Sequence, residues 1–545
     1  MTSWRMTVNQ IDRSQTIVQN IGTTGAIVID SERGPSLPTL FSPGNEARLR
    51  DIFGWPKAGN EAVYDAIMYN RKAPLWACGM FALTDKGENL VVTSTGVTAG
   101  AGVTGTNLLS TSYSPYTGAS LATEYFQIAS KYPNKNNFLS MTCVQNATTK
   151  LFDITLYIIR SAVAPEVYGT YSVSLIPGTQ GNFGKSAYIL DVFANHDLVN
   201  IYMNTFTASQ ASPPTYPTTG AGITTVLAFA GGSKAATSIT LHSTAWANFT
   251  SASRYKADIF MNANPTTTLA DATTDVTTFN SLSANNAPYA DFLWTFPKGN
   301  SPQSIWTSGT GFRYSSPGTG AINNRNLHLL FNWAYVTYEG NGLSFWSNLV
   351  GTHATKYVAM ANIYNALSPS WIDEDNHGGQ LDGQINYFEF DPSETDLQAL
   401  DGAGVNARTY HPSYGPMIMS DKTGKTPSIV SDDSFVGTSR MFNYIISNIV
   451  DQVLVFQITK LNDEFHRRLA IQKASQILNP LKQAGVLMDF KIKCDTSTGS
   501  NDATARANRQ FLFAVAVQAT PNSQTLVFNF LKVGQTVTVD SVLAS

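Results

Sequence analysis

The stretch from about Val436 to Ser545 constrains the fold most, because an amphipathic helix there is followed by several strand-like runs. Asn462 is a good N-cap, and the two acidic residues after it suit the positive end of a helix dipole. Gly485 is placed to end the helix. Between these ends, apolar residues recur at the spacing of one buried helical stripe: Ala470, Ala474, Ile477, Leu478 and Leu481.

Four strand-like runs follow the helix. Met488–Cys494 alternates apolar and polar residues, which is typical of a strand with one wet face. Phe511–Val517 is apolar at nearly every position and predicts a central strand buried on both faces. Leu526–Phe530 and Gln535–Leu543 are the third and fourth runs. The last run is either an ordinary edge strand, the simpler interpretation, or a strand that pairs with another copy by strand addition.

Composition excludes several classes of protein. Charged residues make up only 13% of the 545 residues and the net charge is −3, so there is no electrostatic basis for binding nucleic acid or an anionic membrane. No apolar run approaches the roughly 18 to 20 residues of a membrane span, and the opening MTSWRMTVNQ lacks the apolar core of a signal peptide. The three cysteines are far apart, which favours a reducing compartment. We therefore expect folding in a cytoplasm.

No catalytic template fits the sequence. HExxH and GxSxG motifs do not occur. Gly424-Lys425-Thr426 lacks the first glycine of a phosphate loop, because Met419 occupies that position. The acidic run that begins at Asp373 has Gln384 where a calcium loop needs glutamate. We accordingly predict no catalytic residue, no metal ligand and no cofactor.

The N-terminal residues, 1 to about 20, have strand propensity without enough apolar surface for a core. They are either a frayed terminus or a strand that becomes ordered against another subunit. The apolar positions of this segment are Met6, Val8, Ile11, Ile17 and Val18.

Helix and strand patterns alternate through the middle of the chain, which predicts an α/β sheet. The expected strands include Ala26–Asp30, Phe152–Ile159, Ile259–Met261 and Phe292–Phe296, and the expected helices include Glu46–Phe53, Ala62–Tyr69 and Trp246–Asp258. Residues 85–124 are rich in Gly, Ser and Thr, and their composition predicts a flexible loop.

Several motifs, in order, resemble those of contractile bacteriophage tail sheath proteins. Leu461–Arg468, Leu481–Gly485, Asp489–Asp495 and Thr525–Leu531 resemble the C-terminal domain of that family, and the order and spacing of the four are more specific than any one of them. The resemblance covers nearly the whole chain apart from residues 85–124. The chain departs from the family pattern at His377, where an Arg is usual, and at Arg440, which stands alone where the family has an Arg-rich helix start.

The resemblance implies a multi-domain, β-rich fold of mixed α+β and α/β class, with a C-terminal α/β domain and extended strand arms at both ends. The expected domains are an N-terminal linking arm over 1–20, a discontinuous middle domain over 21–84 and 125–395, a small surface insertion over 85–124, a C-terminal sheath domain over 396–534 and a C-terminal linking arm over 535–545.

The resemblance also implies a structural protein of the virion rather than an enzyme. Subunits would assemble in the host cytoplasm, polymerise as stacked, hexameric rings around a tail tube protein, contact baseplate and tail terminator proteins, and contract to drive the tube through the host envelope. Neither direct nucleic-acid contact nor membrane insertion is expected. The arms would link subunits through Met6, Val8, Ile11, Ile17, Val18, Val537, Val539 and Leu543.

A basic face of the C-terminal domain is the predicted contact with the tube. Ordinary solvation and matching of the helix dipole is the simpler explanation of these charges. The candidate residues are Arg440, Arg467, Arg468, Lys473 and Lys482.

Two other functions remain open on the sequence. One is the sheath of a phage-tail-like injection machine, which the sequence cannot separate from a virion sheath. The other is a carbohydrate-active or receptor-binding β-protein, suggested by the 9 Trp and 23 Tyr residues. A cleft with paired carboxylates would favour the second.

Overall fold

The computed structural model divides the chain into two compact units, Met1–Ser447 (the first unit) and Asn448–Ser545 (the C-terminal unit). The predicted domain boundary at residue 396 therefore lies inside the first unit. The structure describes residues 22–109, 124–135, 138–159, 165–181, 184–204, 216–250, 254–263, 269–285, 287–307, 311–314, 322–360, 379–425, 431–454, 457, 460–498 and 500–520.

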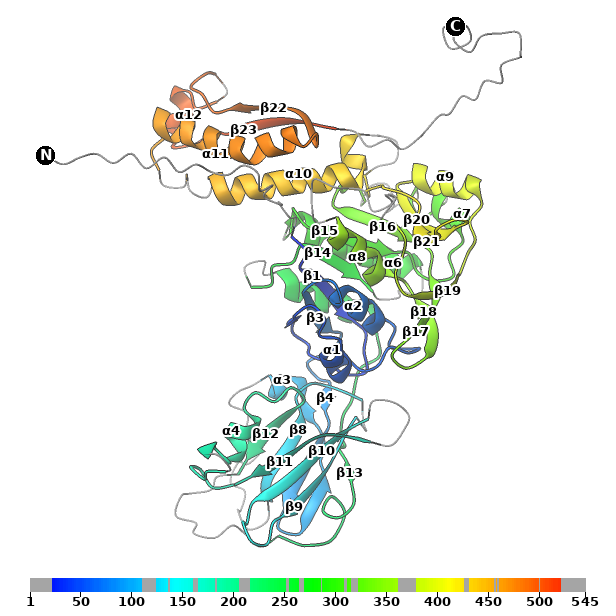
Figure 1. The fold of residues 1–545 in the computed structure, drawn as a ribbon, viewed down its shortest axis with the longest axis vertical. Coiled ribbons are helices and arrows are strands. Elements are labelled where there is room, and N and C mark those ends of the chain that lie inside the picture. The colour runs from blue at the N-terminus through cyan, green and yellow to red at the C-terminus, as the bar shows by residue number, and fades with distance from the viewer. Residues whose placement is uncertain are drawn as a thin grey trace, which may run out of the picture. The chain divides into compact units, whose positions relative to one another are not determined.

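An eight-stranded sheet forms the centre of the first unit (Figure 1). Its six inner strands pair in parallel, and each outer strand pairs antiparallel with its neighbour. In spatial order the strands are Thr39–Phe41 (β2), Leu75–Gly79 (β3), Gly25–Ile29 (β1), Ile259–Asn262 (β14), Asp291–Thr295 (β15), Leu327–Phe331 (β16), Val405–His411 (β20) and Gly415–Ile418 (β21).

Both faces of this sheet are buried, as parallel strands require. Ile27 and Ile29 of β1 belong to one hydrophobic cluster, whereas Ala26 and Val28 belong to the other. The second cluster is rich in aromatic rings, and Phe260 stacks on Phe292 at 4.5 Å between ring centroids. The run Ala26–Asp30 was predicted as a buried strand, and this prediction is confirmed.

Helices cover the sheet, and two of them meet closely because of a glycine. A Cβ atom at Gly351 would lie 1.9 Å from the carbonyl oxygen of Asp65, so only glycine lets these two helices approach this far. The helices of the first unit and its boundary are Glu46–Phe53 (α1), Ala62–Asn70 (α2), Gly105–Leu108 (α3), Ile189–Phe193 (α4), Ile239–Ala247 (α5), Leu269–Asn285 (α6), Pro302–Trp306 (α7), Val350–Ala359 (α8), Glu394–Gly402 (α9) and Val436–Ile449 (α10), with short turns at Asn248–Thr250 (η2) and Asp432–Ser434 (η3).

Strands β4 to β13 form a separate layer of the first unit, which we call the β-domain (Figure 1). Its two four-stranded antiparallel sheets, β11-β10-β9-β13 and β12-β8-β5-β6, share a core in which Phe126 contacts Phe152. The strands are Lys86–Gly87 (β4), Asn89–Thr93 (β5), Gly96–Ala99 (β6), Val103–Thr104 (β7), Glu124–Ser130 (β8), Leu139–Gln145 (β9), Phe152–Ile158 (β10), Glu166–Val173 (β11), Val199–Met203 (β12) and Leu227–Ala228 (β13).

The predicted surface insertion at 85–124 is wrong for its described part, residues 85–109. Strand β5 lies between β8 and β6, and its Leu90 and Val92 side chains are fully buried. The alternation of Leu90 and Val92 marks a strand, but the Gly, Ser and Thr residues around them conceal the pattern. This segment therefore builds the β-domain core.

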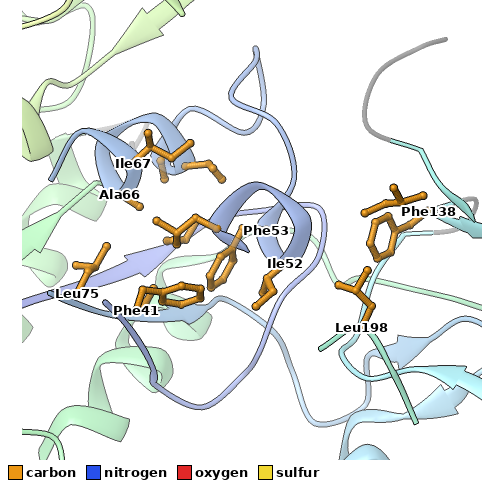
Figure 2. Packing of buried hydrophobic residues seen from close by; sticks show 14 of the residues in the cluster. Phe41, Ile52, Phe53, Ala66, Ile67, Leu75, Phe138 and Leu198 are labelled. Carbon is orange, nitrogen blue, oxygen red and sulfur yellow. The ribbon is translucent and has the colours of Figure 1, made fainter. Parts of the chain in front are cut away.

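The core continues from the sheet into the β-domain. Figure 2 shows Phe41, Phe53 and Leu75 gathered beside α1 and α2, with Phe138 and Leu198 on the β-domain side of Ile52. One cluster of buried residues contains all of these side chains. The described parts of the β-domain are therefore packed against the rest of the first unit and share its core.

A small antiparallel sheet, β18-β17-β19, lies against α2. Its strands are Ala334–Tyr338 (β17), Leu343–Ser347 (β18) and Gln384–Phe388 (β19). Val336 and Phe345 face the core, whereas Tyr335, Trp346 and Tyr387 form an aromatic row on the opposite face, with ring centroids 5.2 to 5.5 Å apart.

The helix predicted at Trp246–Asp258 is wrong. The helix instead spans Ile239–Ala247, because the Ser238 side chain caps it by accepting a hydrogen bond from the Leu241 amide. Trp246 lies near its end and packs on Phe279 of α6, with 4.9 Å between ring centroids. The predicted helix Glu46–Phe53 is confirmed to the residue.

Candidate functional site

The C-terminal unit holds four of the five basic candidate residues and the predicted amphipathic helix, Glu464–Gln483 (α11). Gly485 follows the helix with φ of +78°, a conformation that suits glycine, and confirms the predicted end. The predicted buried stripe is confirmed, because all its members are at least nine-tenths buried: Ala470, Ala474, Ile477, Leu478 and Leu481.

Asp463 rather than Asn462 caps this helix. Its carboxylate accepts hydrogen bonds from the backbone amide of His466 at 2.8 Å and from the His466 ring at 2.7 Å. These bonds hold the pKa of Asp463 below its usual value. Asn462 instead donates to the Asn501 side chain at 2.9 Å and to the carbonyl of Gln510 at 2.8 Å, so it ties the helix start to a distant loop.

Two antiparallel strands, Leu487–Lys493 (β22) and Ala514–Ala519 (β23), complete the described part of this unit, together with the short helix Ala503–Ala507 (α12) and the short π-helix Val450–Leu454 (η4). Phe490 and Ile492 are half-buried and alternate with exposed residues, as predicted. Met488 was predicted to share their face but is exposed, because the register shifts between Leu487 and Asp489.

The prediction that Phe511–Val517 is buried on both faces is wrong. Residues Ala514 and Ala516 of β23 are exposed, whereas Val515 and Val517 are half-buried. Among the described residues, β22 and β23 pair only with each other, so the outer edge of each strand has no strand beside it. The runs Leu526–Phe530 and Gln535–Leu543 lie outside the described residues.

Arg440 does not belong to an exposed basic face, which corrects that part of the prediction. It lies on α10 in the first unit, and its side chain is fully buried. Its Nε donates to Asp291 Oδ2 at 2.8 Å and its Nη2 donates to the carbonyl of Tyr357 at 3.1 Å. Burial raises the pKa of Asp291 to about 6, although attraction to Arg440 opposes the rise. Arg440 therefore forms an ion pair inside the first unit and does not contribute to an exposed basic surface.

The other four basic candidates share the C-terminal unit but not one environment. Arg467 is buried and donates to the carbonyl and side-chain oxygens of Asn462 at 2.8 and 2.9 Å. Arg468 is exposed and paired with Glu464, and Lys482 is exposed and paired with Asp489 at 2.6 Å. Lys473 is half-buried. Of the five, Arg468 and Lys482 keep exposed charges, each with an acidic neighbour.

Two cavities of the first unit bear on the carbohydrate alternative. One, of about 620 Å³, is lined by no carboxylate. The other, of about 310 Å³, is lined by Glu339 and Asp382. Glu339 pairs with Arg71 at 2.6 Å and Asp382 pairs with Lys356 at 3.3 Å, so each carboxylate already has a cationic partner. Neither cavity therefore offers the free carboxylate pair of a glycosidase.

Among the described residues, no cluster of His, Cys, Asp or Glu has the arrangement of a metal site. In the same part of the chain, no helix is both long enough and apolar enough to cross a membrane. The predicted arm positions between Met6 and Val18 and between Val537 and Leu543 lie outside the described residues and stay predictions.

Sequence reasoning missed two exposed apolar residues at the start of α11, Leu461 and Phe465. A signal was present: Phe465 lies five residues before Ala470 and so falls off the buried stripe of the helix. An apolar residue off the stripe is either incidental or part of a contact surface.

Comparison with solved structures identifies the fold. A sheath tail protein from Desulfitobacterium hafniense superposes with a TM-score of 0.53 over 92% of this chain and 97% of its own, at 12% identity. A sheath tail protein from Listeria innocua gives a TM-score of 0.52 over 92% and 96%, at 11% identity. The chain has the sheath tail protein fold. The mixed α and β, multi-domain sheath fold predicted from the motifs is thereby confirmed.

The other comparisons give a weaker match or none. A chain of the contracted helical sheath of the anti-feeding prophage overlaps with a TM-score of 0.38 over 50% of this chain, at 12% identity. Neither the protein-family models nor the curated proteins contain a match to the sequence. The sheath fold is therefore recognised here through structure and through short motifs in the sequence.

Proposed function

We propose that this chain is the structural subunit of a contractile tail sheath, which polymerises as stacked rings around an inner tube. The observation that carries the proposal is the match of fold to two sheath tail proteins over 92% of the chain. The two carboxylates of the smaller cavity are already in ion pairs, which supports a structural rather than an enzymatic role.

The C-terminal unit supplies the means of polymerisation in this proposal. Among the described residues, β22 and β23 each have one edge without a neighbouring strand, and such an edge presents backbone donors and acceptors that an added strand can satisfy. Residues 1–20 and 535–545 are the proposed linking arms, and each would add a strand to the C-terminal unit of a neighbouring copy. Five added hydrogen bonds at about 0.5–1.5 kcal/mol each would contribute several kcal/mol per link.

Contraction would follow from the division into two units. Links between C-terminal units would hold the lattice together while the first units move past one another and form new contacts. The extended sheath would then be a kinetically trapped state. Its partners would be the tube, baseplate and tail terminator proteins, and its location would be the virion, in hexameric rings. The sheath of a phage-tail-like injection machine is the alternative within the same mechanism.

Electron microscopy of the purified chain, with and without Gln535–Ser545, tests the proposal. The intact chain should form striated hollow cylinders, and the truncated chain should stay folded but fail to polymerise. Cylinders formed by the truncated chain would contradict strand exchange. If the intact chain forms no cylinders even when its tube protein is present, the sheath function itself is wrong.

A matched pair of double variants distinguishes the effect of losing backbone hydrogen bonds from the effect of shortening the side chains. Val537→Pro with Val539→Pro removes two backbone donors, whereas Val537→Ala with Val539→Ala keeps them. The proline variant should lose cylinders and the alanine variant should retain them. Equal behaviour of the two variants would mean that the side chains, not a strand ladder, make the link.

A further inference from the structure

The start of α11 carries the most exposed large apolar side chains among the described residues. Leu461 and Phe465 are 71% and 69% exposed, and they lie four residues apart in the C-terminal unit. Leu512, 39% exposed, lies two residues after Gln510, whose carbonyl accepts a hydrogen bond from Asn462 at the helix start. Exposed apolar groups gathered in one place usually mark a contact surface. We call Leu461, Phe465 and Leu512 the helix-start patch.

Buried polar groups hold the helix-start patch in place. Asn462 stands between its two most exposed members and donates to the Gln510 carbonyl at 2.8 Å and to the Asn501 side chain at 2.9 Å. Asn501 is fully buried, accepts a bond from the Leu512 amide at 2.8 Å and donates to the Leu512 carbonyl at 2.7 Å. Arg467 closes the network by donating to Asn462 at 2.8 Å. The patch is therefore preorganised, which lowers the entropic cost of binding.

Charged side chains of both signs lie beside the helix-start patch, because Asp463 and Glu464, 46% and 69% exposed, stand between Leu461 and Phe465. Arg506, in α12, and Arg509, in the turn after it, are exposed, and within the described residues neither forms an ion pair. Arg468 lies one turn into the helix and is paired with Glu464. Asp463 is paired with His466 and Glu464 with Arg468, so the charges near the patch that lack an ion-pair partner among the described residues are those of Arg506 and Arg509. These two arginines favour an acidic partner surface, since complementary charge steers the encounter.

The chain itself carries the complementary charge. Residues 448–545 hold ten Lys and Arg against seven Asp and Glu, a net charge of +3, whereas residues 1–447 hold 25 against 31, a net charge of −6. We propose that the helix-start patch binds the first unit of a second copy of this chain. The proposal deepens the proposed function, on which it rests, by naming a contact between copies that involves no linking arm.

Self-association of the full-length chain tests the contact. Sedimentation and static light scattering over a range of concentrations give the apparent dissociation constant. The double variant Leu461→Ser with Phe465→Ser should raise it about tenfold or more, because two exposed anchors are lost. Arg506→Glu with Arg509→Glu should also weaken association, and added salt should weaken the wild type in the same direction.

Two control variants also replace an exposed apolar side chain with serine, but at positions outside the helix-start patch. Met488→Ser alters a side chain that is 55% exposed on β22, beyond the opposite end of α11, and Leu83→Ser alters one that is 60% exposed in the first unit. Both controls should keep the wild-type dissociation constant within about twofold. Circular dichroism should show the same helix content in all variants, since every substituted side chain is exposed.

Each of four results would overturn the contact. The first is a wild-type chain that stays monomeric at every concentration, and the second is a double variant that associates like the wild type. The third is a double variant with unchanged association but faster proteolysis of residues 521–545, which would mean that the chain's own segment covers the patch. Cylinders formed equally by wild type and double variant would overturn the contact and leave the sheath function standing.

Discussion

The central sheet of the first unit and the two-stranded sheet of the C-terminal unit differ in how far their strands are buried and in how many neighbouring strands each one has. Every residue of β1, β14, β15 and β16 is buried, with helices on both faces and strands on both edges. In β22 and β23 no run of residues is buried, and among the described residues each strand has one neighbour. The first unit is thus stabilised from within, whereas in the described part of the C-terminal unit each strand has one edge without a neighbouring strand and large apolar side chains are exposed.

The largest expected effect comes from the buried sheet. Phe292→Ala removes a ring that stacks on Phe260 at 4.5 Å and meets Phe279 edge-on at 5.1 Å. The free energy of unfolding should fall by about 3–5 kcal/mol. All nine Trp residues precede residue 448, so their fluorescence during urea unfolding reports on the first unit alone.

Phe465→Ala is the matched control in the C-terminal unit. Its ring is exposed, so its removal should change stability by about 0.5 kcal/mol or less. If both phenylalanine variants lost similar stability by hydrogen exchange, the contrast between the two units would be wrong.

Arg440 in the first unit and Arg468 in the C-terminal unit test the same difference between buried and exposed groups. Arg440→Met leaves the buried carboxylate of Asp291 without its cation and should destabilise the first unit by about 3–5 kcal/mol at neutral pH. Because a lone buried carboxyl becomes neutral more readily, this loss should shrink as the pH falls. Arg468→Ala, at an exposed pair, should cost under about 1 kcal/mol. Urea unfolding at pH 8 and pH 5 checks both variants, and a loss for Arg440→Met that grows with acid would contradict the assignment.

A buried carboxyl on α2 predicts a pH dependence of the stability of the first unit. Burial raises the pKa of Asp65 to about 7, although hydrogen bonds from the Gly351 amide and the Ser347 hydroxyl oppose the rise. A raised pKa means that the native state holds this proton more tightly, so stability from Asp65 is present at low pH and is lost as the pH rises toward 7.

Asp65→Asn removes that titration and keeps the acceptor for Gly351. The stability of the variant relative to wild type should therefore rise between pH 4 and pH 7, by at most roughly 4 kcal/mol. Tryptophan fluorescence across this range measures the difference between the two proteins, in which the other titrating groups cancel. A difference that stays flat with pH would mean that Asp65 is ionised at low pH in the folded protein.

The sequence predicted much of this architecture, and its failures have physical causes. Glu46–Phe53 and the stripe from Ala470 to Leu481 were predictable because strong helical periodicity coincides with clear ends. Strand β5 was missed because its composition resembles a loop. The burial of Arg440 was not predictable, since its partner Asp291 lies 149 residues earlier in the chain. Only tertiary structure brings such a pair together.

The C-terminal unit was predictable in its elements but not in its surface. The periodicity of α11 gives its buried side, but periodicity cannot say whether the residues off that side meet solvent or another chain. The apolar run Phe511–Val517 suggested a central strand, yet a strand of that composition also suits an edge that other strands later cover.

A small and local effect is expected at the start of α11, where the cap can be altered without touching the apolar groups. Asp463→Ala removes the carboxylate that accepts the His466 amide at 2.8 Å, and should destabilise the C-terminal unit by about 1 kcal/mol. Asp463→Asn keeps an acceptor and should cost less. Because the first unit is stabilised by its own core, amide exchange should quicken in residues 464–483 and stay unchanged in β14 and β15 for both variants. Exchange that quickened equally in β14 and β15 would mean that the two units unfold as one, and the contrast between a self-sufficient first unit and an open C-terminal unit would then fail.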